Sequence, residues 1–184
     1  MKKIILIGFF MLFAFIADSQ ELKFPTIDAS PADIIYFPLN AAKVKDGPPP
    51  LMRIVYSRPA KKAREIFGVL EQFGKVWRLG ANESTEITLF KSAKIGGKKI
   101  KAGTYSLFAI PNKDKWTLIV NKQINRWGAF SYDEHKDVVR TDIPVKSIDK
   151  PIEYFSITFT TQPEGAMIVF GWDKTFVELP VVIK

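Results

Sequence analysis

Residues 153–161, Glu-Tyr-Phe-Ser-Ile-Thr-Phe-Thr-Thr, alternate between apolar and polar side chains. Phe155, Ile157 and Phe159 fall on one side of an extended chain, while serine and threonines fall on the other. A period of two residues predicts a β-strand that buries one face and exposes the other. Such strands occur in antiparallel sheets that pack one face against a core, so this stretch points to a β fold.

Similar short strands fill much of the remaining chain, with turn signals between them. Gly96-Gly97 lies between two Lys/Ile runs and predicts a tight hairpin, because glycine adopts positive φ at little cost. About ten strands at this spacing favour a mostly β fold, a single antiparallel β-sandwich or jelly-roll-like domain. Besides the strands flanking that hairpin, strands are predicted over 34–39, 51–57, 85–90, 104–110, 115–121, 138–145, 166–172 and 176–183.

One short helix is predicted over residues 59–68. Pro59 suits the first turn of a helix, and Gly68 is a typical residue at its end. Residues 40–50, which contain three consecutive prolines, are predicted to be an extended linker between two strands.

Residues 1–19 have the organisation of a signal peptide. Lys2 and Lys3 precede an apolar run from Ile4 to Ile16, and Ala-Asp-Ser at 17–19 is a small-x-small cleavage pattern. As a helix this run reaches about 20 Å, short of the roughly 30 Å hydrocarbon core of a bilayer. We therefore expect an exported protein, periplasmic or extracellular. Residues 20–184 are then one domain with no transmembrane segment.

The amino-acid composition excludes several kinds of functional site. The 184 residues include no cysteine, which excludes disulfides, thiolate catalysis and cysteine-based zinc sites. The net charge of +8 suits anionic partners, although export argues against nucleic acid. The lysines of residues 94–101 can contact an anionic surface or protect an edge strand from aggregation. No nucleotide-binding loop or nucleophile elbow occurs, and no cofactor is predicted.

Residues 56–90 mix charged and aromatic side chains among several glycines. Arginine binds carboxylate, sulfate or phosphate groups through two parallel hydrogen bonds. One interpretation is therefore a site for a polar anionic or carbohydrate-type ligand. The alternative is a structural brace in which Glu83 pairs with Arg78 or Arg58, because buried charges need partners. The candidate ligand-binding residues are Arg58, Arg64, Arg78, Asn82, Glu83, Trp127 and Tyr132.

The aromatic residues at 127–132 follow a predicted strand, in a loop. There they can stack on sugar rings or pack beneath the loop. Glu83 and Asp133 are candidates for catalysis, since two carboxylates divide the acid and base roles in glycosidases. The single histidine, His135, lies between Asp133 and Asp137. Their spacing is not that of a known metal motif, so no metal site is predicted.

Several short motifs occur in order along the chain, among them Tyr-Ser-Arg-Pro at 56–59, Gly-Lys-Val-Trp-Arg at 74–78, Gly-Ala-Asn-Glu at 80–83, Ala-Gly-Thr-Tyr-Ser-Leu-Phe at 102–108 and Trp-Gly-Ala-Phe at 127–130. With these motifs the chain resembles, over about residues 50–180, the bacterial exported proteins grouped as domain of unknown function 2911. The resemblance implies an exported, mostly β domain with no established activity, substrate or cofactor. Ala63 and Leu79 depart from the family pattern, where Gly and Thr are usual.

Three functions stay open at this stage. The first is binding of a polar anionic or carbohydrate-type ligand at the cell envelope. The second is glycosidase-like hydrolysis by paired carboxylates, and the third is a structural or partner-binding role without a small ligand.

Overall fold

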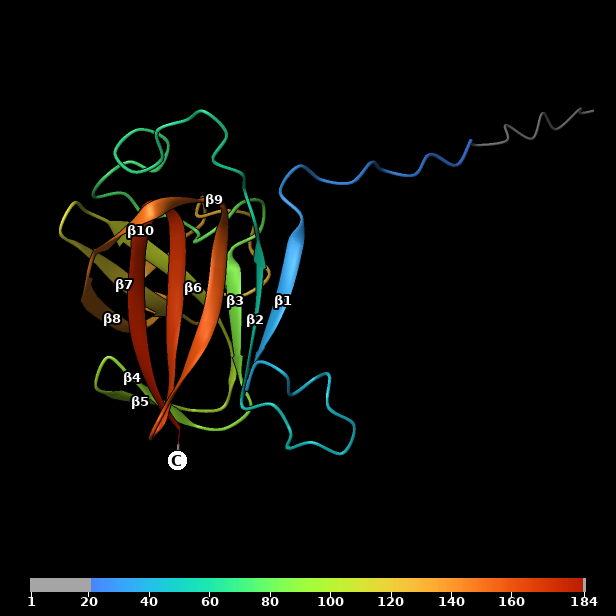
Figure 1. Ribbon diagram of the computed structural model, residues 1–184, viewed down its shortest axis with the longest axis vertical. Helices are drawn as coiled ribbons and strands as arrows, with labels where there is room; N and C mark the ends of the chain where they lie inside the picture. Colours follow the sequence, from blue (N-terminus) through green and yellow to red (C-terminus); the bar gives the residue numbers. More distant parts are fainter. Residues whose placement is uncertain (1–20, 184) are drawn as a thin grey trace, which may run out of the picture.

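A computed structural model describes residues 21–183, which form two antiparallel sheets packed face to face (Figure 1). The first sheet has six strands in the order β1-β2-β3-β6-β7-β8, and the second has four in the order β5-β4-β10-β9. The predicted mostly β fold of two antiparallel sheets is confirmed. The strands are β1 (Ala32–Phe37), β2 (Met52–Ser57), β3 (Thr85–Leu89), β4 (Ala93–Ile95), β5 (Lys98–Ile100), β6 (Gly103–Pro111), β7 (Lys115–Asn121), β8 (Asp137–Pro144), β9 (Lys146–Gln162) and β10 (Gly165–Ile183).

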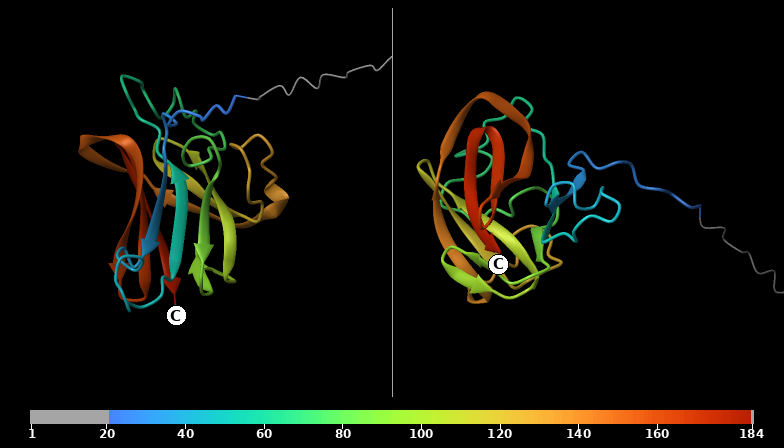
Figure 2. Two further views of the ribbon diagram at one scale, coloured as in Figure 1. Left: turned by 90° about the vertical axis from the view of Figure 1, so that its right-hand side faces the viewer. Right: turned by 60° about the horizontal axis from the view of Figure 1, so that its bottom comes forward.

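The long strands β9 and β10 arch over the upper end of the sandwich, as the two further views in Figure 2 also show. β10 turns near Asp173, whose φ is 53°, and its second half returns beside its first. The amide of Ile183 therefore donates to the carbonyl of Glu164, 2.9 Å away. This return closes the four-stranded sheet against β4 and brings both ends of β10 to the lower end of the molecule.

The alternating residues 153–161 lie in β9 and bury one face, as predicted. Phe155, Ile157 and Phe159 are 0%, 4% and 3% exposed, whereas Thr158 and Thr160 face solvent. Burying one such apolar side chain contributes roughly 1.5–3 kcal/mol. Aromatic rings fill the upper part of the core in edge-to-face, tilted and stacked contacts, with centroids 4.9 to 6.4 Å apart. The set consists of Tyr56, Phe67, Trp77, Trp116, Phe155 and Trp172.

The hairpin predicted at Gly96-Gly97 is confirmed, and the strands predicted over 104–110 and 115–121 form a second hairpin. Gly96 and Gly97 have φ values of 55° and 79° and join β4 to β5, as a turn of this kind requires. The second hairpin joins β6 to β7 through residues 112–114. The linker prediction is wrong in part, because residues 39–46 form turns, with the amide of Val44 donating to the carbonyl of Asn40.

The helix predicted over residues 59–68 is wrong. The segment is extended or turned, and it pairs with the arch of β9 instead of with itself. The amide of Phe155 donates to the carbonyl of Pro59 at 3.0 Å, and the amide of Lys61 donates to the carbonyl of Glu153 at 2.6 Å. The carbonyl of Pro59, which a first helical turn would need as an acceptor, is therefore bonded to β9 instead. Within residues 21–183 the helical structure is a single 3-10 turn, Glu134–Lys136.

The predicted signal peptide, residues 1–19, lies outside the described residues. Within residues 21–183, no helix has the length and apolar character needed to cross a membrane.

Candidate functional site

A hollow of about 270 Å³ lies on the outer face of the six-stranded sheet, near the upper end in Figure 1. Strands β1 and β2 form one side of this outer hollow. The loop 122–133, which crosses the outer face of the same sheet, forms the other. Its lining residues are Ala32, Val55, Tyr56, Ser57, Glu83, Ser84, Glu86 and Asn125.

Three hydrogen bonds fix the loop 122–133 over the sheet. The hydroxyl of Ser106 donates to the carbonyl of Gln123 at 2.5 Å, and the amide of Asn125 donates to Glu86 Oε1 at 2.6 Å. The amide of Ser84 donates to the carbonyl of Arg126 at 2.8 Å. Outward-pointing side chains of β3 and β6 hold this loop in place. The sheet therefore fixes the position of the wall that the loop forms.

Glu83, which lines the outer hollow, forms an antiparallel bridge with Trp127. The hydrogen bonds on either side of the pair run from Ser84 N to Arg126 O and from Gly128 N to Asn82 O, both 2.8 Å. That pattern makes Glu83 and Trp127 a non-hydrogen-bonded pair, in which side chains are closest and project to the same side. The side chain of Trp127, a residue 60% exposed, therefore projects to the same side of the bridge as the side chain of Glu83.

Arg58 does not line the outer hollow. Its Nη1 donates to Asp33 Oδ2 at 3.1 Å, its Nη2 to Ser156 Oγ at 2.9 Å, and its Nε to the carbonyl of Phe155. Asp33 also accepts a hydrogen bond from the Tyr56 hydroxyl at 3.2 Å. Arg58 therefore joins β1 to β9 as a brace, and it borders a second hollow of about 340 Å³.

Arg78 lies behind the loop rather than in the outer hollow. A Cβ placed on Gly128 would come within 2.9 Å of Arg78 Nη1, so the guanidinium fits directly against that glycine. Its Nε is buried with no hydrogen-bond partner among the described residues. Arg78 is one of two arginines that partly offset the effect of burial on Glu71, whose pKa burial raises to about 7.

Neither arginine forms an ion pair with Glu83 among residues 21–183. Arg58 pairs with Asp33 instead, and the guanidinium of Arg78 lies against Gly128. The brace expected around Glu83 is therefore built around Asp33. Asn82 donates to Asp28 Oδ1 at 3.0 Å. The amide of Ser30 and, to a lesser degree, this bond from Asn82 lower the pKa of the Asp28 carboxyl. Arg64 is exposed and donates to the carbonyls of Ala60 and Lys61, within its own loop.

Tyr132 packs beneath its loop instead of standing at the rim. Its ring meets Phe108 edge to face at 5.1 Å, and its hydroxyl donates to Asp137 Oδ2 at 2.7 Å. Burial, followed by that hydrogen bond, raises the pKa of Tyr132. The carboxylate of Asp133 caps the 3-10 turn by accepting from the amide of His135 at 2.9 Å, and Asp133 does not line the outer hollow.

The structure thus gathers a different set of residues from the one predicted. Of the candidates, Glu83 lines the outer hollow and Trp127 stands beside it, while the arginines lie elsewhere. Sequence reasoning missed Ser57, Glu86 and Asn125. The one sequence feature that pointed to any of them was the alternation in β2 and β3, which places Ser57 and Glu86 on the outward face of the sheet.

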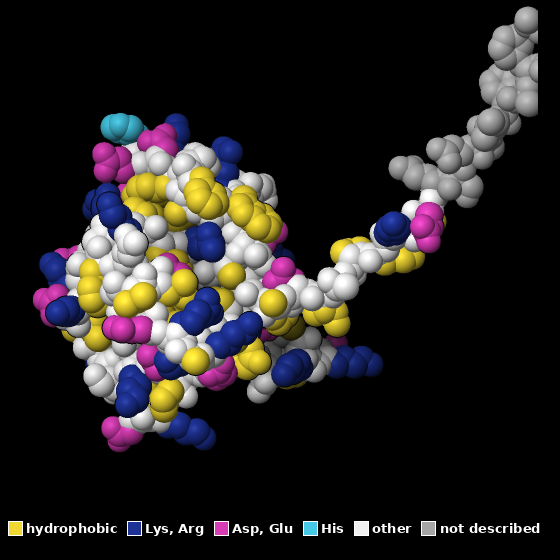
Figure 3. Space-filling view, turned by 90° about the horizontal axis from the view of Figure 1, so that it is seen from above, with side chains coloured by type: hydrophobic (Ala, Val, Ile, Leu, Met, Phe, Trp, Pro, Cys, Tyr) yellow, Lys and Arg dark blue, Asp and Glu magenta, His cyan; other side chains and the backbone are white. Residues whose placement is uncertain are grey.

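The outer hollow has mostly apolar walls and an acidic electrostatic character. It carries the carboxylates of Glu83 and Glu86, and among residues 21–183 no lysine or arginine lines it. In the part of the chain that the structure describes, no three carboxylate or imidazole groups are placed to hold a metal ion. Seen from above, this end also exposes apolar side chains between charged groups (Figure 3), in keeping with the 85% exposure of Phe130 in the loop 122–133.

Comparison with known proteins gives one family. The profile of the family described as Protein of unknown function (DUF2911) matches residues 41–181, most of the chain, so the chain belongs to that family. No curated protein and no solved structure gives a significant match.

Proposed function

We propose that this DUF2911 protein is exported and binds a carbohydrate-type ligand in the outer hollow. The observation that carries the proposal is the Glu83–Trp127 pair, in which an exposed tryptophan and an acidic residue of the hollow's lining project to the same side of an antiparallel bridge. Export is supported by the signal-peptide pattern of residues 1–19.

The chemistry of the lining suits a sugar. A sugar ring presents an apolar face that packs on an aromatic ring, and a rim of hydroxyl groups that need hydrogen-bond partners. Ser57, Glu83 and Glu86 offer hydroxyl and carboxylate oxygens, while Ala32 and Val55 supply apolar wall. Binding sites for small ligands combine apolar walls with a few polar groups in this way.

A carbohydrate fits the outer hollow better than an anion does. An anionic ligand would face two carboxylates with no lysine or arginine on the lining, and like charges repel strongly where water is partly excluded. The guanidinium of Arg58 is bonded to Asp33 and β9, so it is not free to turn to a ligand in the hollow. The ligand class is therefore neutral or amino-substituted rather than acidic.

A glycan array with neutral, amino and acidic oligosaccharides tests the proposal, followed by calorimetric titration of the best-bound sugar. Trp127→Ala should weaken binding by roughly thirtyfold, the effect of about 2 kcal/mol expected when a tryptophan that contacts the ligand is truncated. Tyr154→Ala is the matched control, because Tyr154 is also an exposed aromatic (48%) but borders the second hollow.

Two results would contradict the proposal: no binding to any sugar on the array, or equal loss of affinity in both variants. Hydrolysis by Glu83 and Asp133 is the rival reading, and it predicts new reducing ends in a prolonged incubation. Glu83→Gln would then abolish turnover, whereas for a binding protein it lowers only affinity.

A further inference from the structure

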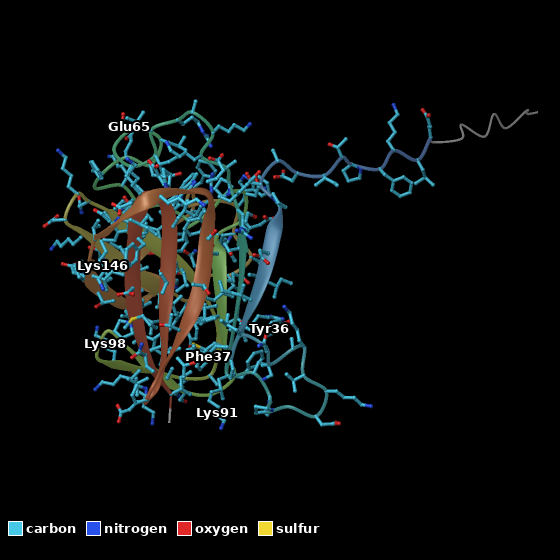
Figure 4. All side chains as sticks on the ribbon, in the orientation of Figure 1. Tyr36, Phe37, Glu65, Lys91, Lys98 and Lys146 are labelled. Atoms are coloured by element: carbon cyan, nitrogen blue, oxygen red, sulfur yellow. The ribbon has the colours of Figure 1, made fainter. Side chains whose placement is uncertain are left out.

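The lower end of the sandwich, opposite the outer hollow, is formed by four segments that the strands bring together: the loop 38–51, residues 90–92, the β4–β5 hairpin and residues 101–102. We call this surface the basic end. Figure 4 labels Lys91 and Lys98 there, whereas Glu65 is labelled at the opposite end. The amide of Phe90 donates to the carbonyl of Leu51 at 3.0 Å, which ties the first two segments together.

The basic end carries a concentration of positive charge. Asp46 is the one carboxylate in its four segments, and Glu164 lies in the adjacent β9–β10 turn. In the part of the chain that the structure describes, none of its lysines forms a salt bridge, although lysines and arginines elsewhere do. Its seven exposed lysines are Lys43, Lys45, Lys91, Lys94, Lys98, Lys99 and Lys101.

Two of these lysines stand directly opposite each other. Lys94 of β4 pairs with Lys99 of β5, so their side chains project from the same face of the sheet. Like charges in that position destabilise a sheet unless an anion lies between them. Lys94, Lys99 and Ser92 also line a hollow of about 350 Å³, whose floor includes Val182. Two ammonium groups and a hydroxyl around such a hollow suit a phosphate group.

Exposed apolar side chains lie among the lysines. Leu39, Val44 and Phe90 are 50%, 53% and 45% exposed, and each belongs to a loop of the basic end. Exposed apolar groups surrounded by lysine are typical of surfaces that lie in the headgroup region of a membrane. Protection of an edge strand explains lysines on β5, the edge of its sheet, but not those of the loop 38–51.

We propose that the basic end docks on the surface of a bilayer that contains anionic phospholipids. The lysines lie against headgroup phosphates, with one phosphate between Lys94 and Lys99, and Leu39, Val44 and Phe90 enter the headgroup layer. Because the outer hollow is at the other end of the sandwich, it then faces away from the bilayer and stays open. This docking does not depend on the proposed sugar binding.

Co-sedimentation with lipid vesicles tests the proposal. The chain should sediment with vesicles of phosphatidylcholine and phosphatidylglycerol in equal parts, and much less with phosphatidylcholine alone. Lys94→Gln/Lys99→Gln should weaken binding by about fivefold for each lysine removed. Binding should also be lost in about 1 M salt, where charges are screened within about 3 Å.

Lys113→Gln/Lys136→Gln is the matched control, since it makes the same change of net charge with two exposed lysines outside the basic end. Every variant keeps residues 1–20, so anything these residues contribute is common to all. The proposal predicts that this control binds almost as well as the unaltered chain. Equal loss in both double variants, equal sedimentation with the two vesicles, or binding to heparin alone would overturn it.

Phe90→Ser tests the apolar part of the surface. It removes an exposed side chain and leaves every charge in place, so we expect weaker sedimentation with the same dependence on salt. Unchanged sedimentation would overturn insertion of Phe90 into the headgroup layer. Unfolding of each variant by urea, with an unchanged midpoint, shows that the fold is intact.

Discussion

Glu83 and Trp127 face each other as a non-hydrogen-bonded antiparallel pair, although each belongs to a loop. The bridge joins the segment before β3 to the loop 122–133, and it determines on which side the exposed indole stands. Any change that moves this loop therefore moves the aromatic side of the proposed sugar site.

Gly128→Ala should disturb that pair. Gly128 has a φ of 64°, and an added Cβ would lie 2.9 Å from Arg78 Nη1 and 3.0 Å from Phe130. We expect a loss of about 1–3 kcal/mol in the free energy of unfolding, from backbone strain and the displaced neighbours. Sugar affinity should also fall, because Trp127 is the adjacent residue.

Gly74→Ala is the matched control, because Gly74 has a similar φ of 73° with nothing within 4 Å of an added Cβ. Gly74→Ala should lose only the stability that backbone strain costs, and it should bind the sugar with unchanged affinity. Urea unfolding and calorimetry measure the two effects. Equal stability losses in both variants would contradict the steric role of Gly128.

Glu71 should make stability depend on pH. Burial raises the pKa of Glu71 to about 7 from 4.5, so the folded chain holds a proton that the unfolded chain releases. The free energy of unfolding should therefore fall as the pH rises from about 4.5 to 7. Glu71→Gln cannot ionise, and at pH 8 it should be more stable than the unaltered chain by up to about 3 kcal/mol.

The same variant should show much less difference at pH 4.5, where Glu71 is protonated in the folded chain. Glu65→Gln, an exposed carboxyl in the same loop, is the control and should change little at either pH. Urea unfolding at the two pH values checks this. A stabilisation by Glu71→Gln that is equal at both would contradict the buried-acid explanation.

Tyr56→Phe should destabilise the junction of the two sheets. The Tyr56 hydroxyl accepts from the amide of Ile157 at 3.1 Å and donates to Asp33, and burial raises its pKa to about 12. Removing it leaves the Ile157 amide buried without that partner, which costs about 1–3 kcal/mol. Tyr105→Phe, which loses an exposed bond to Lys101, should cost less than about 0.5 kcal/mol in the same urea assay.

Trp77 and Trp116 should respond differently to replacement by phenylalanine. Both are buried in the aromatic core, but Trp77 Nε1 donates to the carbonyl of Gly80 at 3.2 Å. Trp116 Nε1 has no partner among the described residues. Because the volume lost is the same, Trp77→Phe should be less stable than Trp116→Phe by about 1 kcal/mol. The opposite order in urea unfolding would contradict this assignment.

Much of the fold could be predicted from local pattern. The alternation of Phe155, Ile157 and Phe159 set the inward face of β9, and the glycines at 96 and 97 set the β4–β5 turn. The helix predicted over 59–68 failed because its signals, Pro59 and Gly68, describe only local preference. Backbone hydrogen bonds to β9 outweighed that preference, and no local pattern records them.

The candidate site was predicted less well, for the same reason. Arg58 was predicted as a ligand-binding residue or a partner of Glu83, but its partner Asp33 comes from β1, which only sheet pairing brings alongside. Glu86 and Asn125 meet because the loop 122–133 folds back over β3.

The sequence by itself therefore determined the strands, their buried faces and their tight turns, since side-chain period and glycine conformation act over a few residues. The tertiary structure alone decided which loops meet: it separated Glu83 from the arginines, paired it with Trp127, and collected distant lysines at one end. Those contacts depend on the order of strands in two sheets, and that order is fixed by packing over the whole core.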